Sequence, residues 1–201
     1  MLSSAIPPAI AAVLASGLTL YSHRLKEVRG ARLFALFCAS IAVWCGGVAL
    51  ERLSSALEAR IFWSQVQHLG IAFTGLLWFL FTSTYTQKFR VYRRPIARIG
   101  VSLALLSMAV VWTNTWHGWF WSSVAWASTT VPPVADYTHG WWFRAVYVPY
   151  NYLFLALGLF TLVQTCFEAQ RSYRNSLVLL VTAGLLPWLT HWIYLAGHLS
   201  P

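Results

Sequence analysis

The charged residues of this chain leave long uncharged stretches between them, and this spacing limits the fold more than any other feature. No Asp, Glu, Lys or Arg occurs in residues 1–22, 33–50, 61–87, 145–167 or 175–201, and a further uncharged stretch begins at residue 99. A helix needs roughly 17–25 mainly apolar residues to cross a bilayer. The six stretches meet this length or come close to it, so we expect six crossings.

The crossings are expected to be α-helices, because a backbone in lipid has to satisfy its own hydrogen bonds. Runs such as LFALFCASIAVW and LLWFLF lack the alternation of a transmembrane β-strand. Only 9% of the residues are charged, far below the usual share of about 25% in a soluble domain. We therefore predict an all-α polytopic membrane bundle forming a single domain over residues 1–201. Its helices are expected at about 4–22, 32–53, 59–87, 96–113, 141–167 and 174–197.

The basic residues predict the orientation. Eleven of the fourteen Lys and Arg residues lie in or beside the segments 23–31, 88–95 and 168–173, whereas Arg52, Arg60 and Arg144 lie at the other ends of the helices. By the positive-inside rule these three loops are cytoplasmic, and both chain ends lie outside. The same distribution argues that the net charge of +9 does not indicate nucleic-acid binding.

The long segment 114–140, expected on the outer side, is rich in aromatic residues. They are Trp116, Trp119, Phe120, Trp121, Trp126, Tyr137, Trp141 and Trp142. Two interpretations stay open: an aromatic belt at the lipid headgroups, or a lid folded over the outer mouth of the bundle. Pro132 and Pro133 favour a turn between two short extended arms.

Polar side chains inside the predicted helices gather at one depth, in the outer half of the bilayer. They are Glu51, Gln65, Gln67, His68, Tyr150, Asn151, Tyr152 and His191. Such residues are costly in lipid and are therefore candidates for function. Each alone could snorkel or bond a neighbouring helix. Their joint depth favours an outer cavity with a few polar anchors and aromatic walls.

Several chemistries find no support in the sequence. The only lysines, Lys26 and Lys88, fall in predicted loops, so a retinal Schiff base is excluded. No phosphate-binding loop, zinc motif or paired-cysteine motif occurs, and we expect no cofactor. His68 and His191 together could ligate a haem across two helices, which is a weak alternative.

Four stretches carry a resemblance to a known family. They are ARLFALF…VWCGGVALERLSSALEARIFWSQVQHLGIAFTGLLWFLFTSTYT, TNTWHGWFWSS, YVPYNYLFLALG and YRNSLVLLVTAGLLPWLTHWIYLAG. The marks within them are Glu51, Phe62, Trp63, Gln67, Gly70, Trp78, Tyr85, Asn114, His117, Tyr152 and Pro187. In order and spacing they resemble the N-terminal seven-transmembrane sensor region of bacterial histidine kinases and diguanylate cyclases.

The resemblance implies a sensory function for nearly the whole chain. It implies a bacterial inner-membrane protein that acts in signal transduction, is not itself an enzyme, and dimerises through a cytoplasmic part that is missing here. Two departures stand out. His191 and Asn175 replace the Asn and Gln typical of members, and the chain stops at Pro201, before the seventh helix and output module. We expect either a truncated fragment or a relative that lacks its output.

We predict that a small hydrophobic or aromatic ligand binds in the outer-leaflet cavity, with membrane lipids as the other partner. The predicted ligand-binding residues are Glu51, Trp63, Gln65, Gln67, His68, Trp116, His117, Trp119, Tyr150, Asn151 and His191. A small transporter or channel is the main alternative, although the inner halves of the helices carry few polar groups for a continuous path.

Overall fold

Five helices in the computed structural model are long and apolar enough to cross a membrane. The structure describes residues 2–25, 27–126, 135–170 and 174–185. The spans are α1 (Leu2–Arg24), α2 (Ala31–Leu53), α3 (Leu57–Thr86), α4 (Arg93–Trp112) and a helix from Phe143 to Glu168, which comprises the π-helical turn η1 (Phe143–Tyr147) and α6 (Val148–Glu168). A shorter apolar helix, Arg174–Leu185, begins where the sixth span was predicted. The polytopic bundle is confirmed, and the rest of the predicted sixth span lies outside the described residues.

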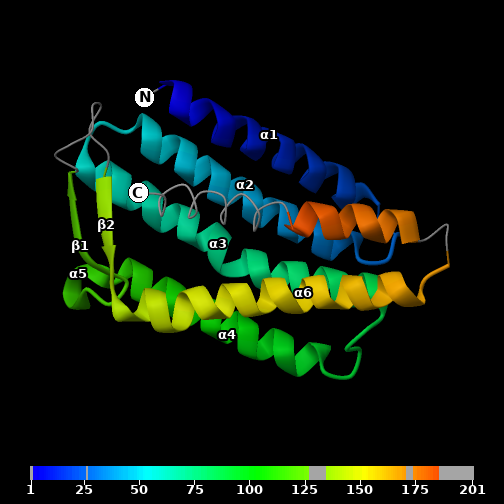
Figure 1. Cartoon of the computed structure of the whole chain (residues 1–201). Helices are drawn as coiled ribbons and strands as arrows, with labels where there is room; N and C mark the ends of the chain where they lie inside the picture. The colour runs from blue at the N-terminus through cyan, green and yellow to red at the C-terminus, as the bar shows by residue number, and fades with distance from the viewer. Residues whose placement is uncertain (1, 26, 127–134, 171–173, 186–201) are drawn as a thin grey trace, which may run out of the picture.

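Helix α3 is the centre of the bundle. It contacts α2, α4 and α6, while α1 packs on the far side of α2 (Figure 1). Two thirds of its membrane-spanning window is buried, against a third or less in the other spans. Its buried Leu76 and Phe79 belong to the main core cluster, together with Val111 of α4 and Phe154 of α6.

Close approach of α2 to α3 depends on glycine. A Cβ atom added at Gly47 would lie 2.7 Å from the Gln67 Cβ, and one added at Gly70 would meet the backbone of Ser40 and Trp44. Small residues allow helix backbones to approach in this way. Gly47 and Gly70 therefore allow Gln67 of α3 to approach α2, where its side chain bonds Glu51.

The segment after α4 folds back on the end of the bundle. A one-turn helix α5 (Asn114–His117) leads to two antiparallel strands, β1 (Trp121–Trp126) and β2 (Ala135–His139). Trp121 pairs with His139 and Trp126 with Ala135, with an irregularity after Trp121. Two extended arms were predicted here and are observed, whereas the turn expected at Pro132 and Pro133 lies outside the described residues.

The aromatic residues of this segment divide between two environments. Phe120 and Trp121 are fully buried and join the main core cluster, whereas Trp116 is 85% exposed and Trp119 and Trp141 are about half exposed. Features of both open interpretations are therefore present: the buried pair packs on the helices, and the exposed indoles lie where headgroup contacts are expected.

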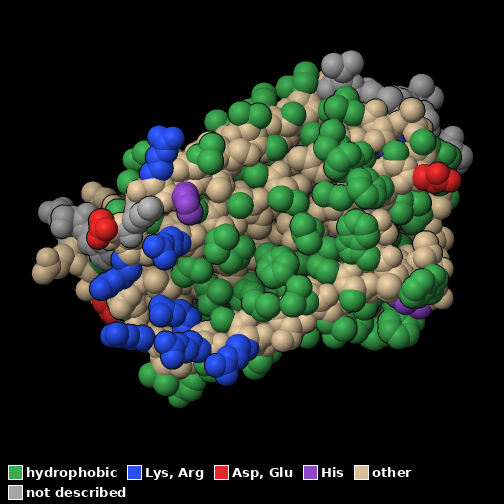
Figure 2. All heavy atoms as spheres, turned by 180° about the vertical axis from the view of Figure 1, so that it is seen from behind, with side chains coloured by type: hydrophobic (Ala, Val, Ile, Leu, Met, Phe, Trp, Pro, Cys, Tyr) green, Lys and Arg blue, Asp and Glu red, His purple; other side chains and the backbone are tan. Residues whose placement is uncertain are grey.

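Most of the described basic residues lie together at the opposite end of the bundle from the hairpin; Arg52, Arg60 and Arg144 are the exceptions. Figure 1 places the C-terminal ends of α1, α3 and α6 at one end, and Figure 2 shows most of the visible Lys and Arg side chains gathered at one end beside a largely hydrophobic middle. The structure thus groups the charges as the positive-inside argument requires. The side of the membrane that each end faces stays a prediction.

A π-helical turn precedes Pro149. Pro149 lies in the first turn of α6, directly after η1. Proline has no N–H to donate to the preceding turn, so the break in regular α-helical hydrogen bonding falls where η1 passes into α6. Pro187, the other proline of the predicted fifth and sixth spans, lies outside the described residues.

Two neighbouring glycines offer a test of the α2–α3 contact. Gly47→Ala is expected to destabilise the protein by about 1–3 kcal/mol, because the new methyl group overlaps the backbone of Gln67. Gly46→Ala meets nothing within 4 Å and should stabilise the helix by about 0.5–1 kcal/mol. Unfolding free energies in mixed micelles measure both changes. Equal effects of the two substitutions would contradict the close packing described here.

Candidate ligand-binding cavity

A cavity of about 480 Å³ lies between α2, α3 and the η1–α6 helix, at the hairpin end of the bundle. Most of its wall is apolar and aromatic. Among the described residues the lining consists of Trp44, His68, Ile71, Thr74, Gly75, His139, Phe143, Tyr147, Val148, Asn151, Tyr152 and Leu155. Cavities of roughly 300–1,000 Å³ are typical of small-molecule sites.

His68 contributes a hydrogen-bond acceptor to this cavity. Its Nδ1 lies 2.6 Å from the Ser64 carbonyl oxygen of the preceding helical turn. A carbonyl can only accept, so Nδ1 carries the proton and the neutral ring keeps an acceptor at Nε2. The ring edges of Phe120 and Trp121, with centroids 4.9 and 5.3 Å away, fix its orientation.

Asn151 of α6 contributes a second acceptor. Its side-chain amide nitrogen donates to the Tyr147 carbonyl oxygen at 2.9 Å. The Oδ1 atom makes no hydrogen bond to any described residue. In contrast, the cavity-lining hydroxyl of Thr74 is already engaged, because it donates to the Gly70 carbonyl and contacts the Ser40 hydroxyl. His68 and Asn151, on two different helices, therefore line a largely apolar space, each with an acceptor that bonds no described residue.

The hairpin is fastened to the bundle beside the cavity by one carboxylate. Glu51 of α2 accepts from the Gln67 amide of α3 at 2.5 Å and from the Tyr137 hydroxyl of β2 at 2.8 Å. The pKa of Tyr137 is raised, first by burial and then by the nearby negative charge of Glu51. Hydrogen bonds to an ionised group are the stronger ones, so this contact ties three elements together.

Two further contacts hold the hairpin. Asn114 accepts from the backbone N–H groups of Phe120 and Trp121 and donates to the Trp121 carbonyl. The Arg60 guanidinium lies 4.9 Å from the centre of the Trp126 ring, an attractive cation–π arrangement. The segment 114–140 is thus anchored at both its beginning and its first strand.

Of the predicted ligand-binding residues that the structure describes, only His68 and Asn151 line the cavity. Glu51 and Gln67 form the fastening beside it. Gln65 instead reaches the Val111 carbonyl of α4 at 3.4 Å, and the Tyr150 hydroxyl donates to the carbonyls of Ala72 and Gly100. The remaining predicted members are placed as follows: Trp63 packs edge-on against Phe62, Trp116 and Trp119 are exposed, His117 bonds Thr113 and the Trp119 N–H, and His191 lies outside the described residues.

Sequence reasoning missed His139, Phe143 and Tyr147. The His139 and Phe143 rings stack with centroids 3.8 Å apart, and all three residues line the cavity. Their spacing of four residues is typical of one helical face, but His139 ends β2 and Phe143 begins η1. The available signal was the four-residue spacing of His139, Phe143 and Tyr147, which leads into the fifth span.

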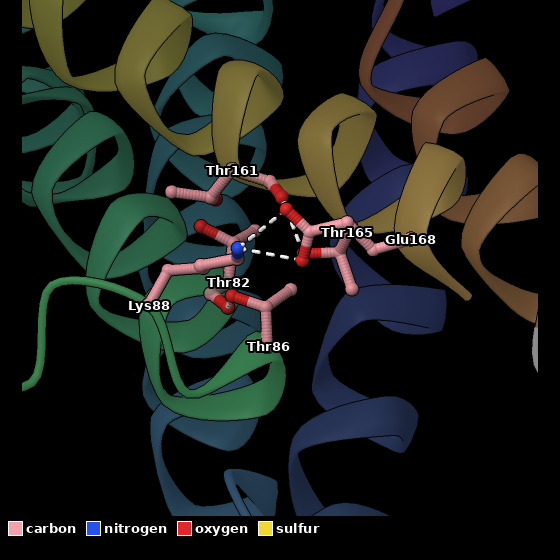
Figure 3. A network of polar contacts seen from close by, with 6 residues as sticks. All are labelled: Thr82, Thr86, Lys88, Thr161, Thr165 and Glu168. Atoms are coloured by element: carbon pink, nitrogen blue, oxygen red, sulfur yellow. Dashed lines mark hydrogen bonds and ion pairs between the residues drawn. The ribbon is translucent and has the colours of Figure 1, made fainter.

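The far end of α3 and α6 carries a different polar group of contacts. The Lys88 ammonium donates to both carboxylate oxygens of Glu168 at 2.7 and 2.8 Å. Figure 3 shows this ion pair next to four threonines of the two helices. Each threonine hydroxyl donates to a carbonyl of its own helix: Thr82, Thr86, Thr161 and Thr165. The four threonine hydroxyls are thus paired with backbone carbonyls. The Lys88–Glu168 ion pair is partly exposed to solvent, so it adds little stability.

Residues 7–201 match a family described as the N-terminal 7TM region of histidine kinase. The chain belongs to this family. The resemblance expected from the four stretches is thereby confirmed, and the chain is a membrane sensor region of the histidine kinase type. No curated protein and no solved structure shows a significant match. The matched region of the kinase is its sensor region and not a catalytic domain.

The Glu51–Tyr137 contact of the sensor region predicts that Tyr137→Phe frees the hairpin. Loss of a hydrogen bond to a carboxylate should destabilise the docked hairpin by about 1.5–3 kcal/mol. Faster amide hydrogen exchange in β1 and β2, with unchanged exchange in α3, would show this. Tyr92→Phe is the matched control, because Tyr92 is largely exposed outside the hairpin. Identical exchange in wild type and Tyr137→Phe would refute the fastening.

His139 predicts a dependence of stability on pH. Burial lowers its pKa, Arg144 lowers it further, and Asp136 opposes the shift. The unfolded chain then binds the proton more readily than the folded one, so stability falls as the pH drops below about 6.5. Between about pH 7.5 and pH 5.5, the melting temperature of wild type should fall further than that of His139→Phe. Parallel curves for the two proteins would contradict the assignment.

Proposed function

We propose that this sensor region detects a small, mainly apolar molecule that carries a hydrogen-bond donor and binds in the cavity between α2, α3 and α6. The observation that carries the proposal is that His68 and Asn151 line an otherwise apolar wall, each with an acceptor atom, Nε2 and Oδ1, that bonds no described residue. An acceptor atom in an apolar wall favours a ligand that can donate a hydrogen bond to it. A ligand hydroxyl or amine group would supply the partner, and the aromatic wall would take the apolar remainder.

The chemistry of the walls narrows the ligand class. Trp44, Phe143 and Tyr147 offer flat aromatic faces, which favour a planar or aromatic ligand. No described Lys or Arg lines the cavity, so a strongly anionic ligand has no counter-charge there. A phenol-like or indole-like molecule fits this combination better than an acid or a sugar.

The position of the cavity supports a route from binding to signalling. One wall is formed by η1 and the first turns of α6, where Pro149 interrupts the helical hydrogen bonding. A ligand shifts an equilibrium only if it binds two arrangements of the helices with different affinity. We infer that occupancy changes the packing of this π-helical turn against α3, and that α6 and the following helix carry the change to the output part of the kinase.

The location of the site relative to the membrane is part of the same proposal. With the basic end in the cytoplasm of a bacterium, the cavity opens in the outer half of the inner membrane. The hairpin would then act as its outer lid. A hydrophobic ligand could arrive from the outer leaflet without crossing the basic end of the bundle.

Native mass spectrometry of protein purified in mild detergent tests the proposal. Wild type is expected to retain a discrete small-molecule mass. His68→Phe and Asn151→Leu should each retain roughly five- to tenfold less of it, the equivalent of one lost hydrogen bond. Gln65→Met is the matched control, because Gln65 lies at similar depth but contacts α4. Equal retention in all four proteins, or no discrete mass in wild type, would overturn the cavity assignment.

A further inference from the structure

Two further cavities lie at the basic end of the bundle, away from the cavity lined by His68 and Asn151. One is an apolar groove of about 370 Å³ between α1, α2 and the Arg174–Leu185 helix. Its lining consists of Leu18, Tyr21, Ser22, Leu25, Val28, Arg29, Ala31, Phe34, Phe81, Tyr85, Ser176, Leu179 and Leu180. The other is a more polar cavity of about 520 Å³ around the turn between α1 and α2, bounded by Glu27, Gly30, Arg32, Leu33 and Thr84.

The two cavities meet at Val28 and Arg29, which line both of them. An apolar slot that joins a polar, charged opening is complementary to an amphipathic molecule. A small polar solute would fill only the opening, and a hydrocarbon would fill only the slot. The shared residues therefore suggest one ligand with an apolar tail and a polar head.

The charged residues around the opening indicate that the polar head of the ligand is anionic. Arg29 and Arg32 are both exposed, and neither makes an ion pair or side-chain hydrogen bond with any described residue. Among the described lining residues Glu27 is the one carboxylate beside two arginines, so these residues give the opening a net positive charge. Helix α2 begins there after Gly30, without a side-chain cap or an acidic residue in its first turn, and its dipole adds to the attraction for an anion.

We propose that this groove binds one anionic phospholipid, with its phosphate between Arg29 and Arg32 and one acyl chain between α1 and the Arg174–Leu185 helix. The groove opens on a lipid-facing surface, because Leu18 and Leu179 on its two walls are 47% and 71% exposed. Basic residues at the membrane surface attract acidic lipids. The bound lipid would join the first helix to the helix that follows α6, at the end nearest the output part of the kinase.

The test compares retention of phosphatidylglycerol and phosphatidylcholine by native mass spectrometry. The protein is prepared in nanodiscs that contain equal amounts of both lipids. Wild type is expected to keep one phosphatidylglycerol preferentially. The Arg29→Gln/Arg32→Gln variant should bind it on the order of twentyfold more weakly, since each basic residue near an acidic surface contributes about a fivefold factor. Arg94→Gln/Arg98→Gln removes the same charge from the start of α4, outside both cavities, and should retain the lipid.

A second variant separates groove binding from simple surface attraction. Ser176→Trp leaves both arginines in place but narrows the apolar slot, and it should lower phosphatidylglycerol retention to a similar extent. Inorganic phosphate at millimolar concentration should not displace the lipid. The proposal is overturned if both arginine double variants lose the lipid equally, if Ser176→Trp keeps it, or if phosphate alone removes it.

Discussion

The absence of water in a bilayer governs the structure of this protein, because every polar group inside the spans needs a partner from the protein itself. The described helices meet this demand mostly within themselves: Thr74, Thr82 and Thr161 each bond a carbonyl one turn earlier. Among the described residues, Ser83 carries the one fully buried side-chain atom without a partner. His68 and Asn151 differ from the threonines: each keeps an acceptor atom that bonds no described residue, and both residues line the same cavity.

The aromatic segment between α4 and α6 closes the end of the bundle in two ways. Phe120 and Trp121 enter the core and contact His68, and His139 at the end of β2 lines the cavity. Tyr137 connects the hairpin to Glu51 and, through Gln67, to α3. Movement of the hairpin would therefore displace a carboxylate of α2 that also bonds α3.

The helices could be predicted closely because hydrophobic length is a strong signal. The expected spans 32–53 and 59–87 are found as Ala31–Leu53 and Leu57–Thr86. The neighbour that each side chain contacts could not be predicted in the same way, because depth along a helix does not determine which neighbouring helix a side chain meets. Gln65 and His68 share a depth, yet Gln65 contacts α4 whereas His68 lines the cavity. His139 was missed because its position depends on how a hairpin docks, which no local periodicity encodes.

The central claim is that the space between α2, α3 and α6 admits a small aromatic ligand, and saturation-transfer NMR with 4-propylphenol measures this directly. Ile71 lines the cavity on α3, so Ile71→Trp fills the space without altering His68 or Asn151. Wild type should transfer saturation to 4-propylphenol, and added indole should abolish the transfer by competition. Ile71→Trp should show no such transfer. Equal transfer from both proteins would place the probe elsewhere and contradict the account.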